Sequence, residues 1–416
     1  MKAPDGVRNV YVHAPFCARR CFYCDFAVEV NRRPDSADWL AAIKTELDWV
    51  QESGPVRLSS VQETLYVGGG TPSVLDPRHV AELAAVVGRQ RTRAPGFEWT
   101  VEANPESFTG SVASRWVEGG VNRVSFGVQS FSSAALRWMG RLHSAEDAGD
   151  ALKAARAAGI SNLSVDLIFG LPASISRDWK GDLERTLSLE APHVSLYGLT
   201  VEKGTPLARA VGEERITPCG ETRYREEYLL AAETLTRAGY EHYELSNFSL
   251  PGFASRHNTA CWKGAPYVGL GNGAHSYSDG RRWWNERDWG TYRDRVARSG
   301  NGRAGDEVLN PRQARLESIW LALRTRDGLP ADSLDPAASS VVHRWEAGGL
   351  AEREDGAVRL TPEGWLVMDA VTLELDGALH RSGPEGSLAP PAASAPVDGS
   401  GSGEIFKYPG VCHGTM

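Results

Sequence analysis

The chain has 416 residues, of which 41% are hydrophobic and 24% charged, and its formal net charge is −8. These values are ordinary for a globular protein of two or three domains, and the negative charge argues against a general nucleic-acid binder. Apolar runs stay well short of the roughly 18–20 residues that span a bilayer, and the first residues lack the apolar stretch of a secretory signal. We therefore expect a cytoplasmic protein.

Strands and helices alternate over the first two-thirds of the chain. Segments rich in β-branched and aromatic residues predict six strands, at residues 9–13, 63–67, 97–102, 123–128, 163–168 and 193–199. Helical periodicity predicts helices at residues 37–50, 79–89, 145–158 and 222–237, with Ser36 as the N-cap of the first. This alternation indicates parallel βαβ units and predicts an α/β fold with a partial (β/α)6 barrel of the TIM type.

The pattern changes after residue 239, where we place the end of the first domain. Residues 240–305 form an extension that is dense in aromatic residues, Gly and Asn. Residues 306–380 predict two helices, a hairpin at 350–360 and a last helix, which is a smaller α+β, winged-helix-like module. Residues 381–416 include a long stretch of Pro, Ala, Ser and Gly, and we expect this tail to be disordered.

Polar residues and glycines stand at or near the ends of successive predicted strands. They are the Gly-Gly-Gly-Thr-Pro run at 68–72, Glu102, Gln129 and Asp166. Each of them alone could simply make a turn or a cap. However, parallel barrels carry their active sites at the carboxyl ends of the strands, so the four positions together predict a site there.

Three cysteines, Cys17, Cys21 and Cys24, follow the first predicted strand with the spacing C-x3-C-x2-C. Zinc sites usually have four ligands in paired spacings, and a disulfide would leave one cysteine over. Three thiolates suit a [4Fe-4S] cluster in which one iron lacks a protein ligand and is open to a small molecule. We predict that these cysteines hold such a cluster, and structural zinc is the alternative.

The cysteine spacing, with Tyr23 before the third cysteine, resembles that of the radical S-adenosylmethionine (SAM) superfamily. In that superfamily the open iron binds the amino and carboxylate groups of SAM, and an electron from the cluster cleaves the sulfonium. Further segments, in chain order, resemble the oxygen-independent coproporphyrinogen III oxidase family, HemN and its relative HemW. They are YVHAPFC from residue 11, GGGTP from 68, VEANP from 101, GVQS from 127, GRLH from 140 and VDLIFGLP from 165. The similarity runs from about residue 10 to residue 376.

This resemblance implies two groups of cofactor-binding residues. The residues that would contact the SAM on the cluster are Tyr11, Gly69 and Glu102. Those that would line the neighbouring pocket, where HemN-type enzymes hold a second SAM, are Tyr23, Gly70, Thr71, Gln129, Arg141 and Asp166. The residue types suit these roles, because carboxylates accept from ribose hydroxyls and an arginine pairs with a carboxylate.

Two features distinguish between the relatives. The oxidase has a fourth cysteine where this chain has Phe26, and HemW-type proteins carry an H-N-x-x-Y-W segment linked to heme binding. Here that segment begins at His257 and ends at Trp262, with Cys261 in place of the tyrosine. His257 is therefore the candidate heme contact, since imidazole is a common axial ligand. Cys261 could replace, assist or merely fill the space of the tyrosine, and His257 could instead be a hydrogen-bonded loop residue.

The resemblance favours a HemW-like heme chaperone that binds heme and transfers it to an acceptor protein, with a [4Fe-4S] cluster and SAM as cofactors. Its partners would be heme, the acceptor and an electron donor of the flavodoxin or ferredoxin type, with peripheral membrane association through the acceptor. Two enzymes are the alternatives: a coproporphyrinogen dehydrogenase-like oxidoreductase that decarboxylates the porphyrinogen, and a HemN-like methyltransferase that uses the second SAM. The missing fourth cysteine weighs against decarboxylation.

Overall fold

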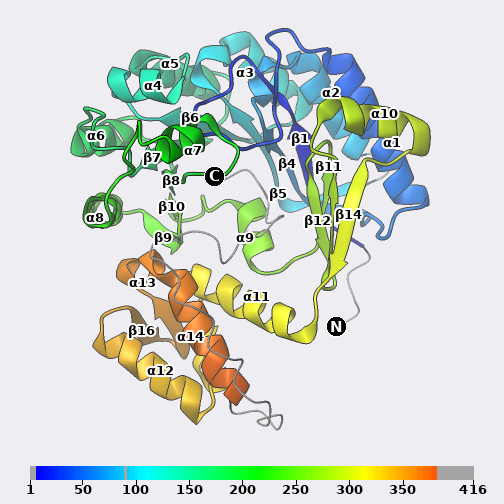
Figure 1. Cartoon of the computed structure of the whole chain (residues 1–416). Coiled ribbons are helices and arrows are strands. Elements are labelled where there is room, and N and C mark those ends of the chain that lie inside the picture. Colours follow the sequence, from blue (N-terminus) through cyan, green and yellow to red (C-terminus); the bar gives the residue numbers. More distant parts are fainter. Residues whose placement is uncertain (1–5, 89–90, 382–416) are drawn as a thin grey trace.

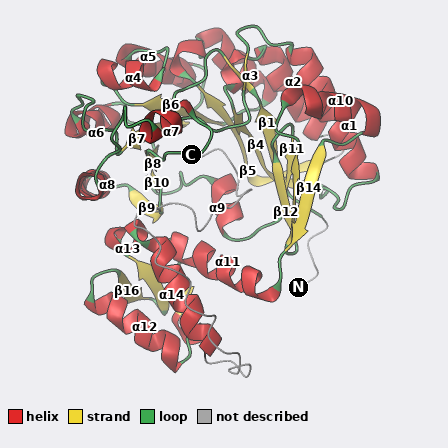
Figure 2. Cartoon of the chain, viewed as in Figure 1, coloured by secondary structure: helices red, strands yellow, loops and turns green. Residues whose placement is uncertain are grey.

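The computed structural model describes residues 6–88 and 91–381, which build a mainly parallel sheet covered by helices (Figures 1 and 2). All six predicted strands are present, as β1 (Asn9–Ala14), β4 (Val61–Gly69), β5 (Thr92–Ala103), β6 (Arg123–Gln129), β7 (Asn162–Phe169) and β8 (His193–Gly198). Each pairs in parallel with the next along the chain. The predicted α/β fold with a partial barrel is confirmed.

Helices follow these strands along the chain and pack around the sheet (Figure 1). They are α1 (Ser36–Glu52), α2 (Pro77–Val87), α3 (Gly110–Gly119), α4 (Ser133–Met139), α5 (Ala145–Ala157), α6 (Trp179–Ser188), α7 (Pro206–Gly212) and α8 (Glu221–Arg237). Trp39, Trp99 and Trp116 are fully buried in the core between helices and sheet. The predicted N-cap of the first helix was wrong by one residue, because Asp35 caps α1 while the hydroxyl of Ser36 accepts from the backbone of Asp76. Residue 89 of the second predicted helix lies outside the described residues.

Residues 240–305 add strands to both edges of the sheet. Strand β10 (Asn247–Ser249) pairs antiparallel with β8, and β9 (Glu241–Glu244) pairs antiparallel with β10 at the edge of the sheet. At the other edge β11 (Tyr267–Leu270) pairs in parallel with β1, and the antiparallel strands β12 (His275–Ser278), β13 (Arg281–Asn285) and β14 (Arg303–Val308) follow. The sheet formed by the described residues thus has twelve strands. Helix α9 (Arg256–Trp262) lies between the barrel and the C-terminal helices, and α10 (Trp289–Ser299) packs on α1 (Figure 1).

The C-terminal elements form a second core. The predicted helices and hairpin are present as α11 (Pro311–Arg324), α12 (Pro336–Ala347), β16 (Ala351–Glu354), β17 (Ala357–Leu360), α13 (Pro362–Leu366) and α14 (Met368–Arg381), and β15 (Leu329–Pro330) pairs with β17. Leu323, Trp345 and Leu375 are buried there, and Trp262 of α9 joins the same apolar cluster.

The domain limits at 239, 305 and 380 stay predictions, and residues 382–416 of the predicted tail lie outside the described residues. A search of the described residues found no helix both long and apolar enough to span a membrane.

Candidate functional site

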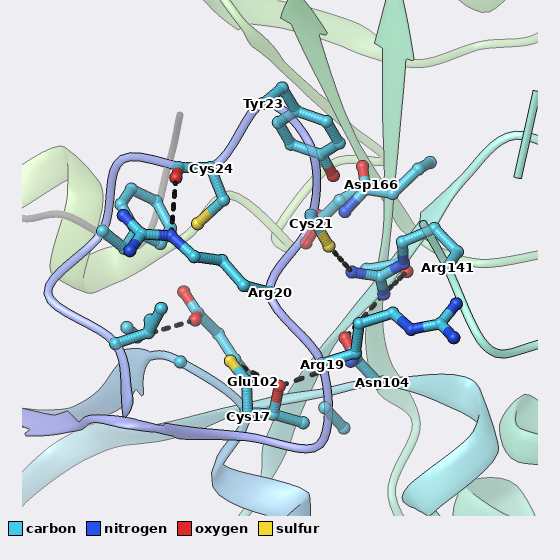
Figure 3. A pocket seen from close by; sticks show the side chains of 18 of the residues that line it. Cys17, Arg19, Arg20, Cys21, Tyr23, Cys24, Glu102, Asn104, Arg141 and Asp166 are labelled. Carbon is cyan, nitrogen blue, oxygen red and sulfur yellow. Dashed lines mark hydrogen bonds between the residues drawn. The ribbon is translucent and has the colours of Figure 1, made fainter. Parts of the chain in front are cut away.

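The three cysteines of the C-x3-C-x2-C run lie on one loop over the carboxyl ends of the barrel strands. Cys17 ends β2 (Phe16–Cys17), which pairs with β3 (Glu29–Val30), and the loop between these strands carries Cys21 and Cys24. The loop is held down by Phe22, whose ring meets Trp138 edge to face with 5.6 Å between the ring centroids. Figure 3 shows the three sulfur atoms around the same hollow.

A cavity of about 740 Å³ lies beneath this loop. It brings together the three cysteines and most of the other predicted site residues, namely Tyr23, Gly69, Gly70, Thr71, Glu102, Gln129, Arg141 and Asp166. Residues that are far apart in sequence therefore meet at the ends of β4, β5, β6 and β7, as the strand-end pattern predicts. The two predicted site residues that do not line this cavity are Tyr11 and His257.

The cavity wall also includes residues that the sequence analysis did not select. They are Arg19, Arg20, Phe26, Val28, Ala103, Asn104, Ser125, Gly127 and Tyr197. For β6 a signal was present, because side chains two residues apart on a strand share a face, and Ser125 and Gly127 precede the predicted Gln129 by four and two residues. Asn104 lies two residues after Glu102, in one of the segments that carry the family resemblance.

Gly69 and Gly68 let the end of β4 approach its neighbours. Gly69 has a φ of +108°, and a Cβ at this position would lie 2.2 Å from the ring of His13. A Cβ at Gly68 would lie 2.8 Å from the carboxylate of Glu102. The amide of Gly69 donates to this carboxylate over 3.0 Å, and Tyr66 donates its hydroxyl proton to it over 2.7 Å. Only glycine fits these close approaches without displacing the carboxylate.

Glu102 and Asp166 place two buried carboxyl groups at the cavity. Burial raises the pKa of Glu102 to about 8, although bonds from Tyr66 and Gly69 act in the opposite direction. Burial also raises the pKa of Asp166, which accepts from the hydroxyl of Ser125 at 3.0 Å. A cation in the cavity would relieve this cost of ionisation, since an opposite charge favours the ionised carboxylate.

Arg141 and Gln129 also line this cavity. Arg141 donates to the side chain of Asn104 and to the carbonyl of Gly127, both over 2.6 Å. Burial disfavours its charge, but nearby Cys21 and other acidic groups outweigh that effect and raise the pKa of the guanidinium. Gln129 has a φ of +66°, and its buried Oε1 has no hydrogen-bond partner among the described residues. Backbone strain and an unpaired acceptor in one residue are typical of a ligand-binding position.

The residue set fits the [4Fe-4S] cluster that the C-x3-C-x2-C run predicts. Thr71 donates to the sulfur of Cys17 over 3.3 Å, and Arg141 donates to that of Cys21 over 3.6 Å. Burial raises the pKa of Cys17 to about 11 and that of Cys24 to about 12, so iron binding would displace thiol protons. Within the described residues no three His, Cys, Asp or Glu side chains converge on a single ion. A cluster offers each thiolate its own iron, so the three sulfurs need not converge on one point.

Tyr11 lies one layer behind the cavity. Its hydroxyl is 3.0 Å from Nδ1 of His13, and its ring stacks on Tyr66 with 6.1 Å between the centroids. Because Tyr66 donates to Glu102, Tyr11 supports the cavity through Tyr66.

His257 lies on α9, which packs against β4, and its side chain is fully buried. Its Nδ1 is 2.6 Å from the hydroxyl of Thr64, and its ring is 5.1 Å from that of Tyr66. The backbone amide of His257 donates to Glu98 over 3.1 Å. Burial lowers the pKa of His257 to about 3, so the imidazole is neutral. The structure therefore places this predicted heme contact inside the barrel, against Thr64 and Tyr66 of β4.

A cleft of about 860 Å³ lies between α9 and α11. Trp262 and Leu321 line it, together with Tyr277 from β12. The guanidinium of Arg324 covers one face of Trp262, 4.0 Å from the ring centroid. Cys261, next to Trp262, is buried against Tyr267 and Tyr277. This partly apolar cleft adjoins Trp262, the last residue of the segment that resembles the heme-linked motif.

Comparisons with known proteins show to which family the chain belongs. The Radical SAM superfamily matches residues 11–185. The heme chaperone HemW of Mycobacterium tuberculosis (strain H37Rv) is 35% identical over 380 residues, which cover 90% of this chain and 96% of the relative. HemW of Bacillus subtilis (strain 168) is 31% identical, covering 88% and 98%, and a mitochondrial radical S-adenosyl methionine domain-containing protein 1 of Bos taurus is 32% identical, covering 91% and 90%.

The structure of coproporphyrinogen III oxidase (HemN) from Escherichia coli superposes with a TM-score of 0.73 at 20% identity, over 90% of this chain and 91% of the oxidase. This likeness shows that the two proteins share a fold. The identities to the HemW relatives show the family as well, because they extend over nearly the whole length of those proteins. The chain therefore belongs to the HemW family within the radical SAM superfamily.

Proposed function

We propose that this protein is a cytoplasmic heme chaperone of the HemW type, which binds heme and transfers it to an acceptor protein. The observation that carries the proposal is the similarity to HemW proteins over nearly their entire length. Phe26 supports it, because this side chain lines the cluster cavity where the oxidase family has a fourth cysteine. An electron donor of the flavodoxin or ferredoxin type would reduce the cluster, and an acceptor in a membrane would bring the chaperone to the membrane surface.

In this proposal Cys17, Cys21 and Cys24 hold the [4Fe-4S] cluster, which supplies an open iron for SAM and an electron for redox chemistry. The buried carboxylates of Glu102 and Asp166 favour a bound cation, and the sulfonium of SAM is one. Their remaining acceptor sites suit ribose hydroxyls, whereas Arg141 suits a carboxylate. Gly69 and Gly70 line the cavity, and we assign their backbone to the amino acid end of the ligand.

We place heme at α9. His257 faces the barrel interior, so a bond between its imidazole and the heme iron requires α9 to move away from β4. The cleft between α9 and α11 is accessible without that movement, and Trp262, Tyr277 and Leu321 give it the aromatic and apolar walls that suit a flat macrocycle. Two placements follow, one in which His257 ligates the iron and one in which the macrocycle rests in the cleft.

A hemin titration of the anaerobically reconstituted protein, followed by visible absorbance, tests the function and separates the placements. We expect saturable binding with one hemin per chain. Weaker binding by His257→Ala alone would assign the iron to His257, and weaker binding by Leu321→Glu alone would assign the macrocycle to the cleft. Leu373→Glu is the matched control, because Leu373 is exposed on α14, outside the cleft. Binding that never saturates would refute the chaperone.

The fold likeness to HemN keeps an enzyme acting on a porphyrinogen as the second candidate. Product analysis separates the two, since a decarboxylase must yield a modified porphyrin together with 5′-deoxyadenosine. A methyltransferase must yield S-adenosylhomocysteine and a methylated product. A chaperone yields neither product from a porphyrinogen, although it binds hemin.

A further inference from the structure

The interior of the barrel, between the cofactor cavity and α9, contains polar side chains that water does not reach. Ser164 and His193 have no exposed surface, and Arg123 is 2% exposed. Buried polar groups destabilise a fold unless they are hydrogen-bonded. The partners of these groups therefore show how the interior is organised.

One continuous chain of hydrogen bonds joins Asp166 in the cavity to the start of α9. Ser164 donates to the Asp166 carboxylate over 3.1 Å, and its oxygen is 2.7 Å from Nδ1 of His193. Nε2 of His193 is 2.7 Å from the hydroxyl of Tyr243, which accepts from the backbone amide of Ser255 over 3.2 Å. Ser255 is the N-cap residue of α9.

When Asp166 is ionised, the donors and acceptors in this series of hydrogen bonds allow only one arrangement of the protons. A carboxylate only accepts, so the single hydroxyl proton of Ser164 points to Asp166 and its oxygen accepts from Nδ1–H of His193. Burial lowers the pKa of His193 well below its usual value, so the ring is neutral and its Nε2 accepts from Tyr243. The oxygen of Tyr243 is then oriented to accept from Ser255. Every donor points toward the cavity.

A second path reaches the same turn of α9 from the other carboxylate. Tyr66 donates to Glu102 over 2.7 Å, and its ring packs on that of His257, 5.1 Å away. His257 is bonded to Thr64, which lies five residues before Gly69 on β4. Five strand residues span about 16 Å, so Thr64 and Gly69 lie far apart along the barrel wall.

We propose that His193 and Tyr243 are positioning residues that couple the cofactor cavity to α9, so that a cation bound beside Asp166 holds α9 against the barrel. The cation favours the ionised carboxylate, which fixes the direction of the hydrogen bonds and strengthens the bond at Ser255. This inference rests on the proposed function in taking SAM as the cation and α9 as the heme-contacting segment. Loss of the cation would then loosen α9 and expose His257.

The test is amide hydrogen exchange of residues 256–262 in the cluster-loaded protein, with and without saturating SAM. We expect SAM to slow this exchange about fivefold or more, which is the lower end of typical coupling between sites. S-adenosylhomocysteine, which lacks the sulfonium charge, should slow it less. Tyr243→Phe removes one hydroxyl from this series of hydrogen bonds and should bring the ratio of the exchange rates with and without SAM closer to one.

Two further variants make the result specific. Ser164→Ala interrupts this series of hydrogen bonds far from α9, so it should also reduce the SAM effect even if Tyr243→Phe loosens α9 by itself. Tyr240→Phe is the matched control, because Tyr240 donates to the carbonyl of Ala191, which is not part of the chain, and this variant should keep the full SAM effect.

The inference is overturned if SAM leaves the exchange of α9 unchanged in the wild type, or if Ser164→Ala keeps the full effect at saturating SAM. Neither outcome depends on heme. A protein that fails to bind hemin but shows the SAM effect on α9 would refute the chaperone and leave the coupling intact. If hemin binds, linkage requires that SAM and hemin change each other's affinity by the same factor.

Discussion

Replacing Glu102 by Gln should have opposite effects on cofactor binding and on the stability of the protein without cofactors. The carboxylate accepts from Tyr66 and from the amide of Gly69, and its remaining acceptor sites face the cavity. In the variant the amide oxygen must accept from Gly69, because a backbone N–H can only donate. The NH2 group then points to the oxygen of Tyr66, and no strong acceptor is left for the ligand.

The loss of a hydrogen bond to a charged group costs about 1.5–3 kcal/mol, so the Kd for SAM should rise about tenfold to a hundredfold. Equilibrium dialysis of the cluster-loaded protein measures this Kd, and the absorbance of the cluster should be unchanged. The matched control is Asp182→Asn, because Asp182 is buried with the same kinds of partner, the hydroxyl of Ser130 and the amide of Phe131, but lies outside the cavity.

The stability of the protein without cofactors should rise in Glu102→Gln, whereas its affinity for SAM falls. The folded state raises the pKa of Glu102 from 4.5 to about 8, so Glu102 lowers stability progressively as the pH rises from 4.5 to 8. Each pKa unit corresponds to about 1.4 kcal/mol, so the cost at pH 7 is about 3 kcal/mol. Glu102→Gln removes this cost, and its thermal midpoint without cofactors should gain several degrees over the wild type between pH 5 and pH 8. Unchanged affinity for SAM, or a stability difference that does not vary with pH, would refute this account of the site.

Two further predictions concern the cluster loop and the end of β4. Replacing Cys17, Cys21 and Cys24 together by Ala should abolish the broad visible absorbance of the reconstituted cluster, and an intact spectrum would contradict the assignment of these ligands. Gly69→Ala should destabilise the fold by roughly 2–4 kcal/mol and lower SAM affinity, because the new Cβ meets His13 in addition to the strain at positive φ. Gly159→Ala, which has a similar φ of +99° but nothing within 4 Å, should cost only about 1–2 kcal/mol in a thermal melt and leave SAM affinity unchanged.

Local patterns in the sequence were sufficient for the barrel strands and for the residues at their carboxyl ends. A strand is identified by its own run of β-branched residues, and parallel pairing then forces Glu102, Gln129 and Asp166 to one edge of the sheet. Side chains on a strand alternate, which explains why Ser125 lines the cavity beside Gln129 although no motif marked it.

Long-range packing decided what these patterns could not specify. Strand β11 has four residues among glycines and aromatic residues, and it becomes the neighbour of β1 only because segments more than 250 residues apart pair. Helix α9 has only seven residues, and its N-terminal amides at Arg256 and His257 donate to the buried carboxylate of Glu98. Neither element has a periodic signal long enough to predict where it docks.

By itself the sequence determined the fold class, the three cysteines with the spacing of a cluster site and the family to which the chain is related. These depend on residue identity, spacing and strand order, which are written along the chain. Only the tertiary structure decided that Tyr11 lies behind the cavity and that His257 is enclosed by Thr64 and Tyr66. The physical reason is that exposure depends on which distant segments cover a side chain, and a motif specifies a residue's neighbours in sequence but not those in space.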